Sequence, residues 1–291
     1  MIDIELLGVV GAGSMGAGIA HLAAQNGFHV VLVDTVPQAL ESASTRIRSL
    51  MEKSIAKGKI TAQDMDEVLS RIKLTSDLRQ LSEVDFVVEA IIEDSETKQA
   101  LFRQLDTICR ADVILTTNTS SISITSIASA TSRAGRVVGM HFFNPPQVMR
   151  LVEVVRGYET SDETVLVTKT VAERMRKTTV EVKRDTPGFI VNRIMIPQFI
   201  EAIRLVEEGV ASKEDIDTAV KLGLNYPMGP FELQDFAGVE IGLHVMDVFY
   251  NELKDSRFAA PQSLRTLIRA GRVGRKVKKG WYDYDGGERH E

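Results

Sequence analysis

A glycine-rich segment directly after the first apolar run constrains the fold more than any other feature of the sequence. Residues 6–10 are apolar and typical of a buried strand, residues 11–16 read GAGSMG, and a helical pattern follows. A second apolar run, residues 30–33, ends in Asp34. This order of strand, glycines, helix, strand and acidic residue is typical of a βαβ unit that binds a dinucleotide.

Each glycine has a mechanical reason in such a unit. Gly11 allows the tight turn out of the strand, Gly13 lets a pyrophosphate approach the backbone, and Gly16 lets the helix pack on the sheet. The amides and the positive dipole end of that helix would hold the phosphates. A glycine-rich turn without a ligand is the alternative, but the presence of every part in the expected order favours the ligand.

Asp34 indicates which dinucleotide binds. A carboxylate at this position accepts hydrogen bonds from an adenosine ribose and repels the additional phosphate of NADP. Residues 35–37 contain no arginine that could receive that phosphate. The sequence therefore predicts NAD as the cofactor.

Composition excludes several other classes of protein. The chain has 291 residues, 44% of them hydrophobic, which is long enough for two domains. Its formal net charge is −5 and it has no extended basic stripe, so we expect no nucleic-acid partner. The acidic residues 1–5 differ from a signal peptide, no apolar run approaches the length of a membrane span, and Cys109 is the only cysteine. We therefore expect a cytoplasmic protein without membrane contacts or internal disulfides, and we assign no metal site.

Strand-like and helix-like segments alternate through the first two-thirds of the chain. Several of the strand-like runs are apolar throughout, as expected for parallel strands that are covered on both faces. This alternation predicts a doubly wound α/β sheet. Strands are expected at 6–10, 29–33, 72–75, 86–88, 113–116, 137–140, 151–155 and 179–182, and helices at 37–57, 62–71 and 96–109.

Convincing strands stop near residue 185. We therefore predict a Rossmann-type NAD-binding domain over residues 1–184 and an all-helical C-terminal domain over residues 185–291, with the substrate cleft and a dimer interface. The first helix of the second domain is expected to begin at Pro187 and to kink at Pro197. Further helices are expected from the N-cap Ser212 to Gly223, over 231–253 and over 263–270.

The helical segment 189–206 is apolar on more than one stripe, which predicts burial on more than one side. A small helical domain can hardly supply that burial alone, so we predict a symmetric homodimer. A central helix inside a monomer is the alternative.

His141 has the most suggestive surroundings of the five histidines. It lies at the end of the apolar run 137–140, where open α/β sheets place their ligands. Glu153 lies within a second apolar run, 151–155, where a carboxylate is costly to bury unless it is paired. If Glu153 receives a ring N–H from His141, the pair would fix the tautomer and stabilise the imidazolium that forms when the other nitrogen takes a proton. A surface-facing Glu153 is the alternative.

Two other polar segments stand out. Residues 116–121 (TTNTSS) follow a predicted strand and would either contact a ligand or cap the next helix. Asn192 is polar within an apolar helix, so we expect it to face a cleft or a hydrogen-bonding partner.

The segments GAGSMGAGIA, VVEAIIE, NTSS, HFFNP, LVEVV, DTPGFIVNR and YPMGPFEL resemble the signature segments of the 3-hydroxyacyl-CoA dehydrogenases, most closely the bacterial 3-hydroxybutyryl-CoA dehydrogenases. The resemblance runs end to end in the same order. It implies NAD-dependent oxidation of an L-3-hydroxyacyl-CoA, of short chain such as 3-hydroxybutyryl-CoA, to the 3-oxoacyl-CoA. Losing a proton from the hydroxyl needs a base that titrates near neutral pH, a task that suits histidine.

The resemblance also implies roles for individual residues. His141 would be the general base and Glu153 its partner, while Ser120 and Asn192 would contact the substrate. For coenzyme A the implied contacts are Ser49 and Lys57. For NAD they are Gly11, Gly13, Ser14, Met15, Gly16, Asp34, Glu93, Lys98, Ser120, Asn144 and Lys276.

The sequence departs from the family pattern in two places. Residues 145–150 (PPQVMR) replace the usual proline-valine-proline and lysine pattern in the loop after His141. Residues 276–281 (KVKKGW) replace a threonine-glycine-rich segment that ends in Gly-Phe.

Two other functions fit parts of the same pattern. A dehydrogenase of free hydroxy acids, such as gulonate, would share the fold and the histidine–glutamate pair but would need no binding site for coenzyme A. A crystallin-like NAD-binding protein would have no turnover. The intact set of Ser120, His141, Glu153 and Asn192 argues against the crystallin-like alternative.

Overall fold

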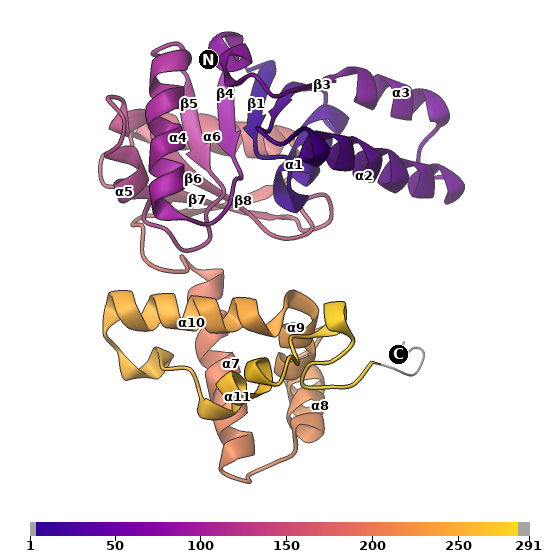
Figure 1. Ribbon diagram of the computed structural model, residues 1–291, viewed down its shortest axis with the longest axis vertical. Helices are drawn as coiled ribbons and strands as arrows, with labels where there is room; N and C mark the ends of the chain where they lie inside the picture. The colour runs from indigo at the N-terminus through magenta and orange to yellow at the C-terminus, as the bar shows by residue number, and fades with distance from the viewer. Residues whose placement is uncertain (1–3, 285–291) are drawn as a thin grey trace. The chain divides into compact units, whose positions relative to one another are not determined.

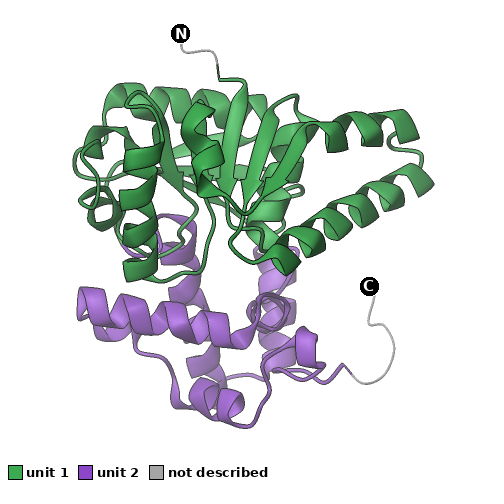
Figure 2. Ribbon diagram, turned by 45° about the horizontal axis from the view of Figure 1, so that its top comes forward, with its two compact units in different colours: residues 1–186 green, residues 187–291 purple. Residues whose placement is uncertain are grey.

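The computed structural model describes residues 4–284 and contains two compact units, residues 1–186 and residues 187–291 (Figure 2). Residues 1–3, which belong to the acidic N-terminal segment, and residues 285–291 lie outside the described part. The boundary between the two units along the chain lies between Thr186 and Pro187.

The first unit is built on an eight-stranded sheet in the order β3-β2-β1-β4-β5-β6-β7-β8. Neighbouring strands are parallel except for the pair β6 and β7. This confirms the predicted α/β class and doubly wound sheet, and each predicted strand is present with its ends shifted by at most two residues. The strands are β1 (Leu6–Val10), β2 (His29–Val33), β3 (Ile72–Thr75), β4 (Phe86–Glu89), β5 (Ile114–Thr117), β6 (Val137–Phe142), β7 (Leu151–Arg156) and β8 (Thr178–Val182).

The antiparallel direction of β7 was not predicted. A parallel return would need a crossover connection of a dozen or more residues, usually a helix. The connection between β6 and β7, residues 143–150, is too short for that, so β7 runs back along β6.

Helices cover both faces of the sheet (Figure 1). On one face, alternate strand residues form an apolar core with helices that include α1 and α6. Helices α2 and α3 lie side by side. On the other face α5 contacts both α4 and β6. The helices of this unit are α1 (Ser14–Gln25), α2 (Pro37–Ala56), α3 (Ala62–Ser70), α4 (Ser95–Ile108), α5 (Ile124–Ala128) and α6 (Asp162–Arg174), with short 3₁₀ helices η1 (Leu78–Glu83) and η2 (Ala134–Arg136).

The alternation of side chains along β6 decides which face carries the polar residues. Val138, Met140 and Phe142 belong to the core beneath α1 and α6. His141 therefore points to the opposite face, together with Gly139, because successive strand residues face opposite sides. A Cβ on Gly139 would lie 2.9 Å from Ile124 of α5, which confirms that direction.

The second unit is helical, and the structure shows no strand over residues 187–284, only isolated bridges. Its central helix α7 packs against α8, α9, α10 and α11 around an apolar core that includes Phe199, Ile203, Phe231 and Phe249. The elements are α7 (Val191–Glu207), α8 (Lys213–Gly223), α9 (Pro230–Ala237), α10 (Val239–Leu253), η3 (Ser256–Phe258), α11 (Gln262–Arg269) and η4 (Arg275–Val277).

Two predictions for this unit were wrong. The first helix does not begin at Pro187, because Gly188 (φ 75°) and Phe189 (φ 51°) adopt left-handed conformations that a right-handed helix excludes, and α7 begins at Val191. The predicted continuous helix over 231–253 is divided into α9 and α10 by Gly238, whose φ is 104°.

Within residues 4–284, no helix combines the length and the apolar character that crossing a bilayer requires.

Candidate functional site

The glycine-rich loop between β1 and α1 is held tightly at both ends and open in the middle. The N–H of Gly11 donates to the Val33 carbonyl at 2.8 Å, and a Cβ on Gly16 would lie only 1.7 Å from the Gly11 oxygen. A Cβ on Gly13, by contrast, would meet nothing within 4 Å, and Gly13 and Ser14 are exposed. The loop therefore offers its backbone to an incoming group, as binding a pyrophosphate requires.

Asp34 lies at the carboxyl end of β2 and accepts a hydrogen bond from the glycine-rich loop. Its Oδ2 accepts the N–H of Ala12 at 2.7 Å, and its Oδ1 accepts the N–H of Val36 at 2.9 Å. An ionised carboxylate has about four acceptor positions. Asp34 can therefore keep both amides and still accept a ribose hydroxyl, so the glycine-rich loop and Asp34 both fit NAD.

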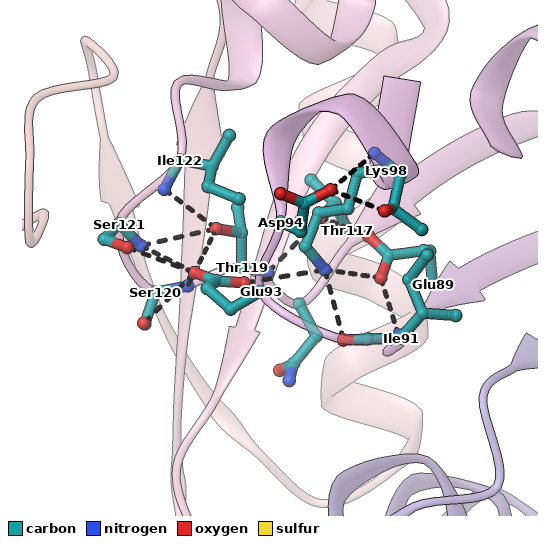
Figure 3. Close-up of polar contacts among 12 residues, drawn as sticks. Glu89, Ile91, Glu93, Asp94, Lys98, Thr117, Thr119, Ser120, Ser121 and Ile122 are labelled. Atoms are coloured by element: carbon teal, nitrogen blue, oxygen red, sulfur yellow. Dashed lines mark hydrogen bonds and ion pairs between the residues drawn. The ribbon is translucent and has the colours of Figure 1, made fainter. Parts of the chain in front are cut away.

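Glu93, in the loop between β4 and α4, organises the segment that contains Ser120 (Figure 3). Its Oε1 accepts the Thr119 hydroxyl at 2.6 Å and the N–H groups of Ser120 and Ser121 at 2.9 and 3.2 Å. Burial raises the pKa of Glu93, but the Lys98 ammonium and these hydrogen bonds outweigh it and leave the pKa below its ordinary value. The Ser120 hydroxyl also lies 3.3 Å from Glu93 Oε1.

Lys98 is deeply buried, with only 1% of its surface exposed, and it contacts two carboxylates. Its Nζ lies 2.5 Å from Glu89 Oε1 and 3.5 Å from Glu93 Oε2 (Figure 3). Glu89 is fully buried and also accepts the Thr117 hydroxyl at 2.6 Å and the Ile91 N–H at 2.7 Å. A glutamate and a lysine near a helix start would ordinarily form a solvated pair of little worth, whereas Lys98 is buried.

Glu89 was missed in the sequence, and Thr117 was noted only as a member of the segment 116–121. Glu89 had the same signal that drew attention to Glu153, a carboxylate inside an apolar run. Because a charge in such a position needs a partner, Glu89 could have been paired with a cation on the next helix.

His141 and Glu153 form the pair that the sequence indicated. The antiparallel register of β6 and β7 places them directly opposite each other, and His141 Nδ1 lies 2.7 Å from Glu153 Oε2. His141 is 6% exposed and Glu153 is fully buried, so the surface-facing alternative for Glu153 is wrong. A carboxylate beside Nδ1 selects the tautomer in which Nδ1 carries the hydrogen, because an ionised carboxylate can only accept.

Neighbouring residues fix the histidine. The Phe143 ring lies 4.6 Å from the imidazole, measured between ring centroids. Asn118, just after β5, accepts the N–H of Phe142 at 2.8 Å and so ties the ends of β5 and β6 together.

These features share one edge of the sheet. The glycine-rich loop, the loop with Glu93, the segment with Ser120, and His141 lie at the carboxyl ends of β1, β4, β5 and β6, which are successive parallel neighbours. Ligands of open α/β sheets bind outside this edge. The arrangement can therefore hold a dinucleotide beside a histidine that is prepared to take a proton.

The other predicted site residues lie elsewhere on the chain. Ser49 is half-buried within α2, and Lys57 is exposed at its C-cap. Asn144 is exposed in the loop after β6. Asn192, half-buried in the first turn of α7, and Lys276, exposed in η4, belong to the second unit.

No group of three or more histidine, cysteine, aspartate or glutamate side chains that could hold a metal ion occurs among the residues that the structure describes.

Comparison with known proteins gives the same family for both units. The family model of the 3-hydroxyacyl-CoA dehydrogenase NAD binding domain matches residues 6–186, and the model of the C-terminal domain matches residues 188–284. A probable 3-hydroxybutyryl-CoA dehydrogenase of Bacillus subtilis is 45% identical over 98% of this chain and 99% of its own length. The 3-hydroxybutyryl-CoA dehydrogenase of Clostridioides difficile is 42% identical over 96% of this chain and 99% of its own length.

A solved structure agrees with these relatives. The (S)-3-hydroxybutyryl-CoA dehydrogenase of Ralstonia eutropha superposes with a TM-score of 0.94 at 41% identity and covers 98% of this chain and 100% of that one. With both family models matched in order and relatives aligned over nearly the whole length, the chain belongs to the 3-hydroxyacyl-CoA dehydrogenase family.

Proposed function

We propose that this protein oxidises short-chain L-3-hydroxyacyl-CoA, including 3-hydroxybutyryl-CoA, to the 3-oxoacyl-CoA with NAD, and catalyses the reverse reaction. The observation that carries the proposal is the buried His141–Glu153 contact of 2.7 Å, on the sheet edge that also carries the glycine-rich loop. The names of the similar proteins support the substrate class.

His141 acts as the general base in this proposal. Its Nε2 takes the proton of the substrate hydroxyl, while Nδ1 donates to Glu153. The buried carboxylate stabilises the imidazolium that results, and it holds the ring in one orientation throughout. NAD, when bound, supplies the acceptor for the hydride that leaves carbon.

Ser120 and Asn192 are proposed to hold the substrate oxygen as its charge changes. The contact of the Ser120 hydroxyl with Glu93 at 3.3 Å supports a fixed position for this side chain. Asn192 is proposed on the resemblance alone.

Cofactor and coenzyme A contacts follow the same resemblance. Residues 1–184 are proposed as the NAD-binding domain, and residues 185–291 as the domain for substrate and dimer contacts. Lys98 is proposed to act through Glu93, because its ammonium lies against two carboxylates in the structure. The proposed direct NAD contacts are Gly11, Gly13, Ser14, Met15, Gly16, Asp34, Glu93, Ser120, Asn144 and Lys276, and the proposed coenzyme A contacts are Ser49 and Lys57.

The oxidation of NADH by acetoacetyl-CoA tests the reaction. We expect turnover with acetoacetyl-CoA and little with free acetoacetate, and no oxidation of gulonate by NAD. Equal turnover with the free acids would favour a dehydrogenase of free hydroxy acids instead. No turnover with any 3-oxoacyl-CoA, across chain lengths, would favour a non-catalytic NAD-binding protein.

NADH is expected to be the preferred nucleotide by a wide margin in kcat/KM. The Asp34 carboxylate would repel the additional phosphate of NADPH, and no arginine follows it in residues 35–37. Measuring kcat/KM for both nucleotides at fixed acetoacetyl-CoA checks this. Equal values would contradict the assignment of Asp34.

We further propose a homodimer in the cytoplasm. Two observations support the proposal: the segment 189–206 is apolar on more than one stripe, and the second unit leaves Leu222 (82%), Leu224 (60%) and Phe236 (53%) exposed. Light scattering at micromolar concentration is expected to give twice the mass of one chain. A monomer mass under these conditions would contradict the dimer.

A further inference from the structure

The loop between β6 and β7, residues 143–150, contains Asn144 and the segment 145–150 that departs from the family pattern. It forms a compact turn in which the Pro145 carbonyl accepts the N–H groups of Val148 and Met149, each at 3.0 Å. The loop joins the strand of His141 to the strand of Glu153. Any shift of the loop would therefore move Asn144 and strain the ends of both strands.

Lys177 reaches this loop from a fixed backbone. Helix α6 ends with the paired hydrogen bonds of a Schellman motif, in which Lys177 N–H donates to Ala172 and Arg176 N–H donates to Glu173, at 3.0 and 2.8 Å. Arg176 has the left-handed conformation that this motif needs, with φ 59°. The next residue, Thr178, donates to the Arg150 carbonyl at 2.8 Å and begins β8.

The side chain of Lys177 closes the turn. Its Nζ donates to the Pro146 carbonyl at 2.5 Å and to the Met149 carbonyl at 2.8 Å. Lys177 is only 7% exposed, and burial lowers the pKa of its ammonium. Burying a cation is costly unless it is well bonded, so these two carbonyls are the compensation for its position.

Helix α1 also packs against the loop. A Cβ on Gly18 would lie 2.9 Å from Gln147 Nε2 and 3.0 Å from the ring of Pro146. Gly18 belongs to the helix whose first turn forms the glycine-rich loop. The loop 143–150 thus contacts both Lys177 and α1.

We infer that Lys177 is a positioning residue, which holds the loop 143–150 so that Asn144 and the end of the His141 strand keep their places relative to α1. Lys177 donates to loop carbonyls and acts through the loop. The inference rests on the proposed function, in which Asn144 contacts NAD and His141 is the general base.

Lys177→Met tests the inference, because methionine keeps the apolar stem and removes both hydrogen bonds. We expect kcat with acetoacetyl-CoA to fall roughly tenfold or more, since small displacements of positioning groups have effects of this size. Lys177→Arg keeps donors at the end of a long stem, and we expect it to recover most of the lost kcat. If Lys177 had a purely structural role, kcat in Lys177→Arg would recover only as far as the thermal stability of that variant recovers.

Lys169→Met is the matched control. Lys169 lies on α6, close in sequence to Lys177, and its ammonium forms an ion pair with Glu181 of β8 at 2.6 Å. We expect its kcat to stay within about twofold of the parent, because partly exposed ion pairs contribute little. Equal kcat for Lys177→Met and Lys169→Met would overturn the inference.

Two further measurements keep the test decisive. If Lys177→Met does not fold, Lys177→Gln, which removes the ammonium and keeps one amide donor group, takes its place, and an unchanged kcat in that variant would overturn the inference. If the parent has no activity, the proposed function fails, and hydrogen exchange then tests whether Lys177 holds the loop. Exchange in a peptide covering residues 143–150 is expected to increase in Lys177→Met and not in Lys169→Met, and equal exchange would show that it does not.

Discussion

Glu153→Gln is expected to lower kcat by on the order of a hundredfold or more, with the fold intact. Glutamine has the same shape, so the side chain still fits at its position on β7, between β6 and β8. It carries no charge to stabilise the imidazolium of His141, and its amide can donate a hydrogen bond to Nδ1, which would favour the wrong tautomer. Steady-state kinetics with acetoacetyl-CoA, with circular dichroism to confirm folding, measure the effect.

Glu181→Gln is the control for that experiment. Glu181 lies on the neighbouring strand β8, but its partners are Arg156 and Lys169 rather than the histidine. We expect near-parent kcat for Glu181→Gln. A folded Glu153→Gln variant with the same kcat as this control would remove Glu153 from the mechanism.

Lys98→Met is expected to reduce the free energy of unfolding by about 3–5 kcal/mol, because it leaves Glu89 as an uncompensated buried charge. Glu89 would still accept hydrogen bonds from Thr117 and Ile91, but the ion at 2.5 Å would be lost. Urea denaturation of the parent and the variant measures the difference.

The double variant Lys98→Met/Glu89→Gln separates the charge effect from packing. We expect it to be more stable than Lys98→Met alone, because no buried charge remains unpaired. Lys73→Met, at an exposed lysine that contacts Gln80, is the control and is expected to change stability by less than about 0.5 kcal/mol. A Lys98→Met variant as stable as this control would show that the buried pair contributes nothing.

The sequence was sufficient to predict the sheet, because several strands are apolar runs, strand-like and helix-like segments alternate, and the glycine motif fixes the position of the first crossover. It did not predict that β7 is antiparallel, since a hydrophobic run carries no direction. The short connection of residues 143–150 contains that information, because it leaves no room for a crossover helix.

The parts of the candidate site that lie on strands or directly after them could be predicted from the sequence. His141 and Glu153 were found by their positions in apolar runs, and their contact depends on the antiparallel register. Lys177 could not be found this way, because its role depends on a left-handed Arg176 and on carbonyls of a distant loop. Backbone conformation of this kind leaves little trace in residue type when the left-handed residue is not glycine.

The two amide hydrogen bonds of Asp34 have a consequence for altering nucleotide choice. Replacing this aspartate with a basic or apolar residue to admit a 2′-phosphate would also remove the carboxylate that accepts the N–H groups of Ala12 and Val36. The phosphate-binding turn would then keep the hydrogen bond from the Gly11 N–H to the Val33 carbonyl but lose the one that holds Ala12, at the moment its new ligand is introduced. Engineering toward NADPH therefore requires a substitute acceptor for those two amides as well as a new cation.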